Sequence, residues 1–410
     1  MQLAKRILGE GLLTSEGELH RRQRQLIQPV FQQDNIPSYA NVTTDYALDI
    51  SSHWYDHATI DIHKEFMHMT LAIVSKAFLD VSIGESGIKE IDQYVTTIIE
   101  YFNRARMPFA SIIEKVPLPS NMRFHHAKKH LDKIIYRIID SHVNSYGSEH
   151  NKQQDGSYPH KDLISLLLQG QADGYISASE NNIAVNTRNK KIHNITSNNR
   201  QQLRDNVMTI FLAGHETVAN ALTWTFYLLS QNPKEENILH EEVDSVLDDN
   251  DHTVPTVKDI SKLEYTERVF AESMRIYPPA WAIGRQAIKD CKIGGYIIPA
   301  DSSILMSQYL MHHDSRYFPE PERFAPDRWS PQEKAKRPRF SYFPFGGGVR
   351  SCIGETFAWM EGILAIATIA RRWKMRIMPG YPIVLQPLVT LRPKHGMQMR
   401  LIDRNNVGHI

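Results

Sequence analysis

A short segment in the last quarter of the chain combines residue types that bind a metal through sulfur. From Phe345 the sequence reads FGGGVRSCIG, so the thiol of Cys352 follows the cation of Arg350 by two positions. The three glycines that begin at Gly346 allow a backbone to turn sharply or to lie against a flat group. After Gly354 the chain is expected to enter a helix, and a helix N-terminus and a nearby cation both favour thiolate over thiol. The thiolate is the form of cysteine that binds metal.

Two other interpretations of Cys352 need no metal. One is a buried cysteine in a glycine-rich turn, which is the usual situation of an arbitrary cysteine. The other is a nucleophile that attacks an acyl group with help from one of the 19 histidines, but no local motif supports it. A phosphate-binding loop is weaker still, because its Lys-Ser/Thr end is absent. The second cysteine, Cys291, lies in a polar turn region, and we assign it no role.

The segment from Phe345 to Gly354 fills the pattern F-x-x-G-x-R-x-C-x-G completely, and it resembles the haem-ligand loop of the cytochrome P-450 superfamily. The resemblance implies that Cys352 is the axial ligand of a haem iron, where a thiolate pushes electron density toward O–O cleavage. It also implies that Arg350 pairs with a haem propionate. Phe345, Gly346 and Gly354 complete the expected cofactor-binding set of this loop.

A second unusual segment lies in the middle of a long predicted helix, Asn198 to Ser230. At ~1.5 Å per residue this helix would be about 50 Å long, which is enough to cross the molecule. The residues AGHET, from Ala213 to Thr217, put glycine and polar side chains where a buried helix would favour leucine. A threonine hydroxyl can bond to a carbonyl one turn earlier and open the helix, and Gly214 allows close approach of a flat ligand or dioxygen. Taken alone, such a polar patch is more often a solvated face.

Considered together with Cys352, the segment AGHET resembles the oxygen-activation motif of the same family. The resemblance implies that Thr217 hydrogen-bonds bound oxygen and that Glu216 helps to relay protons. Ala213 and Gly214 are expected to lie against the haem. The acid–alcohol pair favours a monooxygenase over the peroxide-using or rearranging members of the family.

Glu272 and Arg275 stand at positions i and i+3 of a predicted helix and can pair on one face. On a surface such a pair would contribute only ~0.3–0.5 kcal/mol. The sequence ESMR resembles the E-x-x-R motif of the family, and PERF, at Pro321 to Phe324, resembles its partner motif. We therefore expect Arg323 to reach the same carboxylate. In a buried network of this kind, removing one member would leave a charge unpaired at a cost of ~3–5 kcal/mol.

A basic segment near the start, HRRQR, places His20 and Arg24 one helical turn apart. By itself the segment predicts a solvated basic helix face, and such a face can bind an acidic partner. In the family this position usually reads W-x-x-x-R, and both ends contact haem propionates. His20 replaces the tryptophan and can still donate a hydrogen bond. Arg285 is a further candidate for a haem propionate.

The elements that carry these residues are mostly helical. Apolar residues recur at three- and four-residue spacings in the segments 94–102, 123–145, 198–230, 262–277 and 355–373. Short strands are predicted at 292–298, 303–306 and 397–402. The pattern indicates a mainly α protein with a small β portion. The resemblance implies the cytochrome P-450 fold, a large helical body around haem with short sheets.

The motifs follow the order of the family from His20 to Gly354, so we expect residues 1–410 to form a single cytochrome P-450 domain. The first motif begins only twenty residues into the chain, whereas the family carries helices and most of its small sheet before it. We therefore expect this domain to lack its N-terminal part. Periodicity fades in the segment 170–199, which contains seven asparagines between Asn181 and Asn199. This segment is expected to be a mobile surface insertion.

Composition removes several other classes of function. The chain of 410 residues has 47 basic and 46 acidic side chains, and a net charge of +1 gives no argument for nucleic acid as a partner. No apolar run reaches the ~18 residues that span a bilayer. The first residues mix charges into a short apolar stretch, which is unlike a secretory signal. Two cysteines cannot form a disulfide framework, and they favour a reducing compartment, so we expect a cytoplasmic, bacterial-type soluble protein.

Together these features predict a haem-thiolate monooxygenase that inserts one oxygen atom of O2 into an apolar substrate by hydroxylation or epoxidation. The implied cofactor is haem b, iron protoporphyrin IX. Electrons from NAD(P)H would arrive through a ferredoxin with its reductase or through a flavoprotein reductase. The alternative is a truncated haem-binding remnant without turnover. Ala213, Trp281 and Ile283 indicate an apolar pocket, and the substrate class is left open among fatty acids, terpenes, steroids and polyketides.

Overall fold

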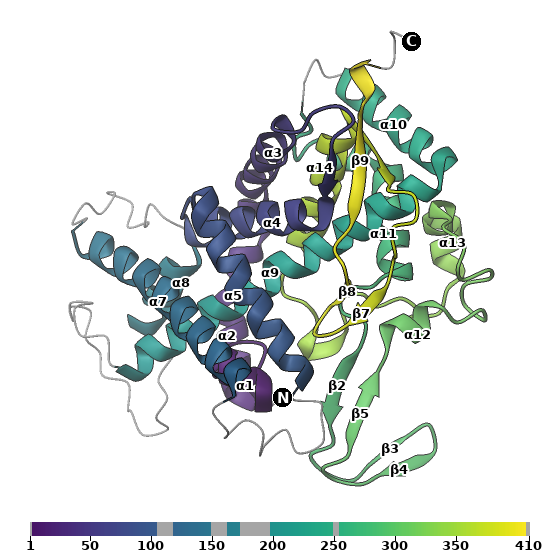
Figure 1. Cartoon of the computed structure of the whole chain (residues 1–410). Coiled ribbons are helices and arrows are strands. Elements are labelled where there is room, and N and C mark those ends of the chain that lie inside the picture. Colours follow the sequence, from purple (N-terminus) through teal and green to yellow (C-terminus); the bar gives the residue numbers. More distant parts are fainter. Residues whose placement is uncertain (1, 105–117, 149–161, 173–196, 249–253, 407–410) are drawn as a thin grey trace. The chain divides into compact units, whose positions relative to one another are not determined.

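The structure is a computed structural model that describes residues 2–104, 118–148, 162–172, 197–248 and 254–406 (Figure 1). The chain divides into two compact units. The first comprises Met1–Tyr46 and Met67–Glu216, and the second comprises Ala47–Phe66 and Thr217–Ile410. The chain passes between the units within three helices, α3 (Ile36–Ser52), α4 (Ile62–Leu79) and α9 (Ser197–Gln231).

Helices also build the rest of what the structure describes of the first unit. They are α1 (Gln2–Leu8), α2 (Gly17–Ile27), α5 (Glu85–Arg104), α7 (Pro119–Ser148) and α8 (Leu163–Ala172), with 3-10 turns at Gln28–Phe31 and Gln33–Asn35. Helix α5 forms because its apolar residues recur at helical spacing. Its buried residues are Ile88, Ile91, Val95, Ile98, Ile99 and Tyr101. This stripe faces α7, where the rings of Tyr101 and Phe124 stack with centroids 4.0 Å apart.

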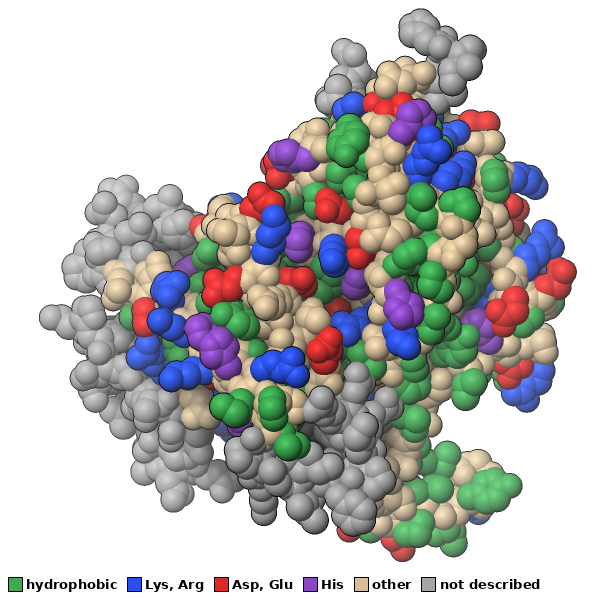
Figure 2. All heavy atoms as spheres, viewed as in Figure 1, with side chains coloured by type: hydrophobic (Ala, Val, Ile, Leu, Met, Phe, Trp, Pro, Cys, Tyr) green, Lys and Arg blue, Asp and Glu red, His purple; other side chains and the backbone are tan. Residues whose placement is uncertain are grey.

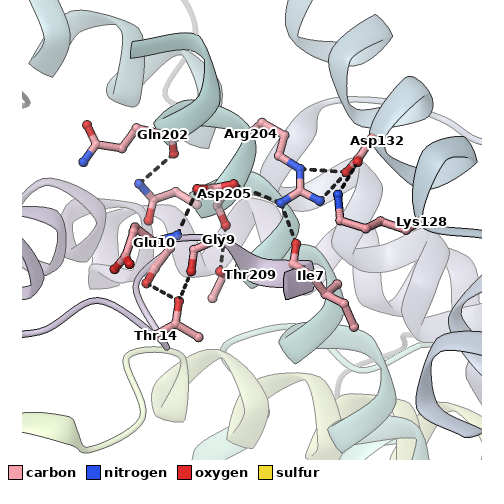
Figure 3. A network of polar contacts seen from close by, with 12 residues as sticks. Ile7, Gly9, Glu10, Thr14, Lys128, Asp132, Gln202, Arg204, Asp205 and Thr209 are labelled. Carbon is pink, nitrogen blue, oxygen red and sulfur yellow. Dashed lines mark hydrogen bonds and ion pairs between the residues drawn. The ribbon is translucent and has the colours of Figure 1, made fainter. Parts of the chain in front are cut away.

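The segment after α1 is tied to α9 by polar contacts (Figure 3). The backbone N–H of Glu10 donates to a carboxylate oxygen of Asp205 at 2.9 Å. Arg204 donates to the same carboxylate at 2.9 Å and to the carbonyl of Ile7 at 2.5 Å, and it also pairs with Asp132 of α7. Three separate parts of the first unit therefore meet at two adjacent residues of α9.

Two glycines allow this segment to lie directly on α9. Gly9 has a φ of +55°, and a Cβ at this position would lie 2.0 Å from the carboxylate of Asp205. At Gly11 a Cβ would lie 2.2 Å from the hydroxyl of Thr209 and 2.4 Å from the backbone carbonyl oxygen of Asp205. Since atoms cannot approach so closely, the contact between the two segments depends on the absence of side chains.

The second unit combines helices with short antiparallel strands. Its described helices are α10 (Pro233–Asp248), α11 (Glu264–Ile276), α12 (Gln308–His312), α13 (Pro331–Lys336) and α14 (Glu355–Ala370), with 3-10 turns at Ile260–Lys262, Pro326–Trp329, Gly348–Arg350 and Arg404–Asn406. One sheet has three strands in the order β1 (Thr59–Asp61), β9 (Gln398–Asp403), β6 (Trp373–Ile377). Its register pairs Trp373 with Asp403 and Thr59 with Arg400.

Three two-stranded sheets complete the second unit. They pair β2 (Ile283–Gln286) with β5 (Ser303–Met306), β3 (Cys291–Ile293) with β4 (Tyr296–Ile298), and β7 (Leu385–Pro387) with β8 (Leu391–Pro393). The β2–β5 register places Arg285 opposite Ile304. The turn of the β3–β4 hairpin uses Gly294 and Gly295, both at positive φ. Hydrophobic side chains are visible on the surface of this hairpin (Figure 2), and Tyr296 and Ile297 are exposed.

Helix α14 begins just after Cys352 and is deeply buried over its C-terminal half. Residues from Gly362 to Ala370 are all buried, so the helix is apolar on every side, as expected of a helix inside a core. A Cβ at Gly362 would lie 2.3 Å from the ring of Phe270 on α11. Close packing of α11 on α14 therefore depends on this glycine.

The structure confirms the predicted fold class, a mainly α protein with small sheets. The predicted helix 198–230 is α9, and its AGHET segment lies within a continuous α-helix. One predicted helix end is wrong. The helix predicted over 355–373 ends at Ala370, and Trp373 is the first residue of strand β6. Most of the predicted insertion 170–199 lies outside the described residues. Among the helices that the structure describes, none is both long enough and apolar enough to cross a membrane.

Candidate active site

The cysteine loop of the second unit is a tight turn that leads directly into α14. Gly346 and Gly348 have φ values of +73° and +70°, a region that glycine adopts without strain. The backbone N–H of Cys352 donates to the carbonyl of Phe345 at 2.9 Å and closes the loop. Cys352 is exposed, and α14 begins three residues later at Glu355. The thiol is therefore accessible and lies beside a helix N-terminus, a position that favours the thiolate.

A close contact explains the glycine at position 347, whereas positive φ values explain those at 346 and 348. A Cβ at Gly347 would lie 2.7 Å from the ring of Phe340, which is closer than real side chains approach. A Cβ at Gly346 would lie 3.9 Å from the Cδ1 atom of Ile283 on β2, an ordinary contact distance. Gly347 thus allows the loop to lie against its own preceding segment, and Gly346 lies beside strand β2.

A cavity of about 790 Å³ lies beside this loop, within the second unit. Its walls are largely apolar and come from β2, β5, α12 and the loop itself, including Ile283, Leu305, Met306, Leu310, Phe343 and Gly347. Arg285 on β2 also lines the cavity, and it is partly exposed. Its size is that of a typical ligand or cofactor site. Asp314 lines the cavity as well and pairs with Arg316 at 2.5 Å. A largely apolar cavity with the cation of Arg285 in its wall suits a large apolar ligand that carries a negative charge.

The predicted pair of Glu272 and Arg275 is present on α11 and is fully buried. Arg275 donates from Nε and Nη2 to the two carboxylate oxygens of Glu272, each at 2.9 Å. Glu272 also accepts from Nε of Arg328 at 3.2 Å, from Nε1 of Trp329 at 2.9 Å and from the backbone N–H of Ala325 at 3.1 Å. The buried carboxylate therefore has five donors, which is the condition for a stable buried charge.

The prediction that Arg323 reaches Glu272 is wrong, because Arg328 occupies that place. The side chain of Arg323 is exposed and binds Glu320 at 3.1 Å, and only its backbone carbonyl takes part, accepting from Arg275 at 3.2 Å. The 3-10 turn Pro326–Trp329 packs on α11 and directs Arg328 inward. The sequence signal for this is the neighbouring Trp329, since tryptophan side chains are mostly buried.

The AGHET residues differ in burial according to their positions on α9. His215 and Glu216 are buried, Gly214 and Thr217 are partly exposed, and Ala213 is exposed. Within the first unit, Thr70 of α4 donates to the carbonyl of His215 at 2.9 Å. A Cβ at Gly214 would lie 2.9 Å from Cγ2 of Val74, so the missing side chain gives room to α4.

His215 is the polar residue of this segment that the structure explains most fully. Its Nδ1 lies 2.9 Å from the carbonyl of Phe211, and burial lowers the pKa of the imidazole. The side chain is therefore neutral at neutral pH. It contributes a buried, uncharged group to α9.

The two predicted residues of α2 belong to the first unit and lie on the protected side of their helix. His20 is buried and Arg24 is partly exposed, whereas Arg21 and Arg22 are exposed and bind Glu18 at 2.6 Å and 2.9 Å. The basic segment is thus divided into a solvated pair and an inward pair. Contacts of the inward pair with a haem stay a prediction.

Sequence reasoning missed three residues of this region, namely Arg328, Trp329 and His312. His312 is the last residue of α12, and its Nε2 accepts from the backbone N–H of Phe343 at 3.0 Å. His312 is followed by His313 and Asp314, and this local sequence gives no signal for such a role.

Comparisons with known proteins identify the family. The family profile of the cytochrome P450 proteins matches residues 1–399. The chain belongs to the cytochrome P450 family. As a cytochrome P450 it is a haem-iron monooxygenase, which uses O2 and electrons from a redox partner to oxidise an apolar organic substrate.

Curated relatives of this cytochrome P450 include three enzymes from Streptomyces. Cyclooctatin synthase of Streptomyces melanosporofaciens is 36% identical over 95% of this chain and 78% of its own length. Cyclooctat-9-en-7-ol 5-monooxygenase of the same organism is 32% identical over 92% of this chain and 75% of its own length. Pentalenene oxygenase of Streptomyces avermitilis is 30% identical over 98% of this chain and 82% of its own length.

Solved structures support the same fold for this cytochrome P450. A crystal structure of a cytochrome P450 matches with a TM-score of 0.78 and 23% identity, covering 98% of this chain and 86% of that chain. The haem domain of cytochrome P450DA matches with a TM-score of 0.79 and 21% identity, covering 98% of this chain and 82% of that chain.

The residues of the second unit fit the haem that the cytochrome P450 family uses. The exposed thiol of Cys352 supplies a soft ligand for iron. The neighbouring cavity offers apolar walls for a porphyrin and the cation of Arg285 for a propionate. Gly346 to Gly348 keep side chains away from the space beside the loop.

Proposed function

We propose that Cys352 is the axial thiolate of a haem b and that the chain hydroxylates or epoxidises a cyclic terpene. The observation that carries the first part is the exposed thiol in a closed glycine loop at the start of α14. When bound, the haem supplies an iron centre at which dioxygen is reduced and one oxygen atom is passed to the substrate. The other oxygen atom leaves as water, and this requires two electrons and two protons.

The chain's own residues hold the cofactor and handle the protons in this proposal. The propionates would be held by Arg350, Arg285, Arg24 and His20, since each can donate a hydrogen bond to a carboxylate. Glu216 is buried on α9, and Thr217 beside it is partly exposed. In this proposal the carboxyl group of Glu216 helps to relay protons, and the Oγ1 hydroxyl of Thr217 passes them on.

The electron source in this proposal is a ferredoxin with its NAD(P)H-dependent reductase, or a flavoprotein reductase. The segment before the cysteine loop carries exposed cations at Lys334, Lys336 and Arg339, which would attract an acidic electron carrier. A cytoplasmic location agrees with such partners and with the presence of only two cysteines in the chain.

A cyclic terpene is the substrate class that the relatives favour among fatty acids, terpenes, steroids and polyketides. Three relatives at 30–36% identity carry names built on cyclooctatin, cyclooctat-9-en-7-ol and pentalenene.

The reduced carbon monoxide difference spectrum tests the role of Cys352. We expect a strongly red-shifted Soret band in the wild-type protein expressed with a supply of haem. Cys352→Ser should abolish this band, because the thiolate is lost. Cys291→Ser is the matched control, since it removes the only other cysteine of the sequence and should leave the band unchanged. A red-shifted band of equal strength in Cys352→Ser would contradict the proposal.

A further inference from the structure

A buried histidine lies between the Glu272–Arg275 pair and the loop that carries Cys352. His312 is fully buried at the end of α12. On one side its backbone carbonyl accepts from Nη1 of Arg275 at 3.0 Å. On the other side its Nε2 accepts from the backbone N–H of Phe343 at 3.0 Å. One residue therefore contacts both the buried ion pair and the start of the cysteine loop.

The contact with Phe343 defines the state of the imidazole. A backbone N–H can only donate, so Nε2 must be the unprotonated nitrogen and the ring proton lies on Nδ1. Burial and the charge of Arg275 lower the pKa of His312 to about 3, which keeps the ring neutral. The acceptor is thus present throughout the ordinary pH range.

The same bond is the first of a series that leads to Cys352. The carbonyl of Phe343 accepts from the N–H of Gly346 at 2.9 Å, and the carbonyl of Phe345 accepts from the N–H of Cys352 at 2.9 Å. The residue before Phe343 is also held, because the hydroxyl of Tyr342 donates to the carbonyl of Ala271 at 3.0 Å. The ring of Tyr342 lies 4.9 Å from that of His312. The loop therefore begins at a rigid point on α11 and α12.

We propose that His312 is a positioning residue for Cys352, because its Nε2 holds the Phe343 amide and thereby the origin of the cysteine loop. Through its carbonyl it also couples the loop to Arg275. The inference deepens the proposed function, since it concerns the placement of the thiolate that would bind the haem iron.

Two conservative substitutions separate the bond from general packing. In His312→Gln the side-chain oxygen stands four bonds from Cα, as Nε2 does, so it can accept from the Phe343 amide. In His312→Asn the oxygen stands three bonds from Cα and falls short of that amide. Both variants keep a small polar amide in the same buried place. His313→Asn is the control on the next residue, whose Nδ1 contacts the carbonyl of Tyr309.

Hydrogen exchange of the peptide that contains Phe343 measures the bond directly in the purified holoprotein. We expect His312→Asn to speed exchange of this amide by about 3- to 10-fold, which corresponds to the loss of one ordinary buried hydrogen bond. His312→Gln and His313→Asn should exchange as the wild type does. Equal exchange in the Asn and Gln variants of His312 would overturn the proposal.

The carbon monoxide difference spectrum then shows whether the bond to the Phe343 amide affects the thiolate ligation by Cys352. We expect His312→Asn to lose part of the red-shifted band to an unshifted band, while His312→Gln and His313→Asn keep the wild-type ratio. A wild-type ratio in His312→Asn would also overturn the proposal. If the wild type itself has no red-shifted band, the proposed function fails, and the exchange experiment alone decides the role of His312.

Discussion

At the scale of single residues, Glu272 shows how a buried charge is kept. Its carboxylate is completely buried, and its donors come from Arg275, Arg328, Trp329 and Ala325. A carboxylate out of water loses its hydration, so every donor removed leaves the charge less compensated. The two arginines at 323 and 328 differ in this respect, because only the second one reaches the carboxylate with its side chain.

Replacing these two arginines separately tests that distinction. We expect Arg328→Leu to lower the free energy of unfolding by about 1.5–3 kcal/mol, the usual value of a hydrogen bond to a charged group. Arg323→Leu should cost no more than about 0.5 kcal/mol, since its pair with Glu320 is exposed. Urea unfolding of both variants measures the difference. An equal loss in the two would show that Arg323 belongs to the network after all.

Glu361 on α14 is a buried carboxyl of a different kind. Among the described residues neither of its side-chain oxygens has a hydrogen-bond partner, and the residue is completely buried. Burial raises its pKa well above the usual value near 4.5. The group is therefore protonated in the folded protein at pH values at which the unfolded chain has already lost the proton.

This difference predicts how stability depends on pH. Above pH ~4.5 and below the raised pKa of Glu361, the folded state binds one proton more than the unfolded state. As pH rises through this range, the contribution of Glu361 to the free energy of unfolding therefore falls by about 1.4 kcal/mol per pH unit. We expect Glu361→Gln to lack this slope when urea unfolding is measured at about pH 5, 6 and 7. Glu322→Gln, at an exposed glutamate, is the control. Parallel pH profiles of Glu361→Gln and the wild type would refute the assignment.

At the scale of elements, the contact between α9 and the segment after α1 depends on backbone conformation and space together. Gly9 and Gly17 have nearly the same φ, +55° and +54°. They differ in their surroundings, because a Cβ at Gly9 would strike the carboxylate of Asp205, whereas a Cβ at Gly17 would meet nothing within 4 Å. Asp205 cannot move away without losing its bonds to Glu10 and Arg204.

Replacing each glycine with alanine therefore separates the cost of a left-handed backbone from the cost of disrupted polar contacts. Gly17→Ala should lose about 1–2 kcal/mol, the cost of a left-handed conformation for a residue with a Cβ. Gly9→Ala should lose the same amount and, in addition, about 1–3 kcal/mol for the disrupted polar contacts of Asp205. Thermal unfolding of the two variants gives the comparison. If Gly9→Ala is no less stable than Gly17→Ala, the segment is not held on α9 as described.

At the scale of the whole molecule, the chain carries the cytochrome P450 fold over nearly all of its length. Solved cytochrome P450 structures match 98% of it, and the relatives from Streptomyces align over 92–98% of it. The chain spans 78% of cyclooctatin synthase. Product formation by the 410-residue chain is therefore the property to measure.

Turnover with a defined set of reagents distinguishes an enzyme from a haem-binding remnant. We expect the haem-loaded chain, supplied with NADPH, a ferredoxin, its reductase and pentalenene as the probe, to form a product that is one oxygen atom heavier. Cys352→Ser should reduce product to background. Consumption of NADPH without product from any of several cyclic terpenes, with ferredoxin and flavoprotein partners alike, would favour the remnant.

The sequence by itself determined the parts of this protein that depend on neighbouring residues. The glycine loop and Cys352 are contiguous, the AGHET segment lies on one helix, and Glu272 and Arg275 are one turn apart. Local spacing decides whether such groups can act together, so the fold class and the family followed from the sequence.

Only the tertiary structure decided which distant residues complete those groups. Arg328 and Arg323 lie five positions apart in similar motifs, and the packing of a 3-10 turn on α11 selects Arg328. The contact of His312 with Phe343 joins residues 31 positions apart. Contacts of this kind depend on how elements pack, because side chains far apart in sequence meet only when burial of the core brings their elements together.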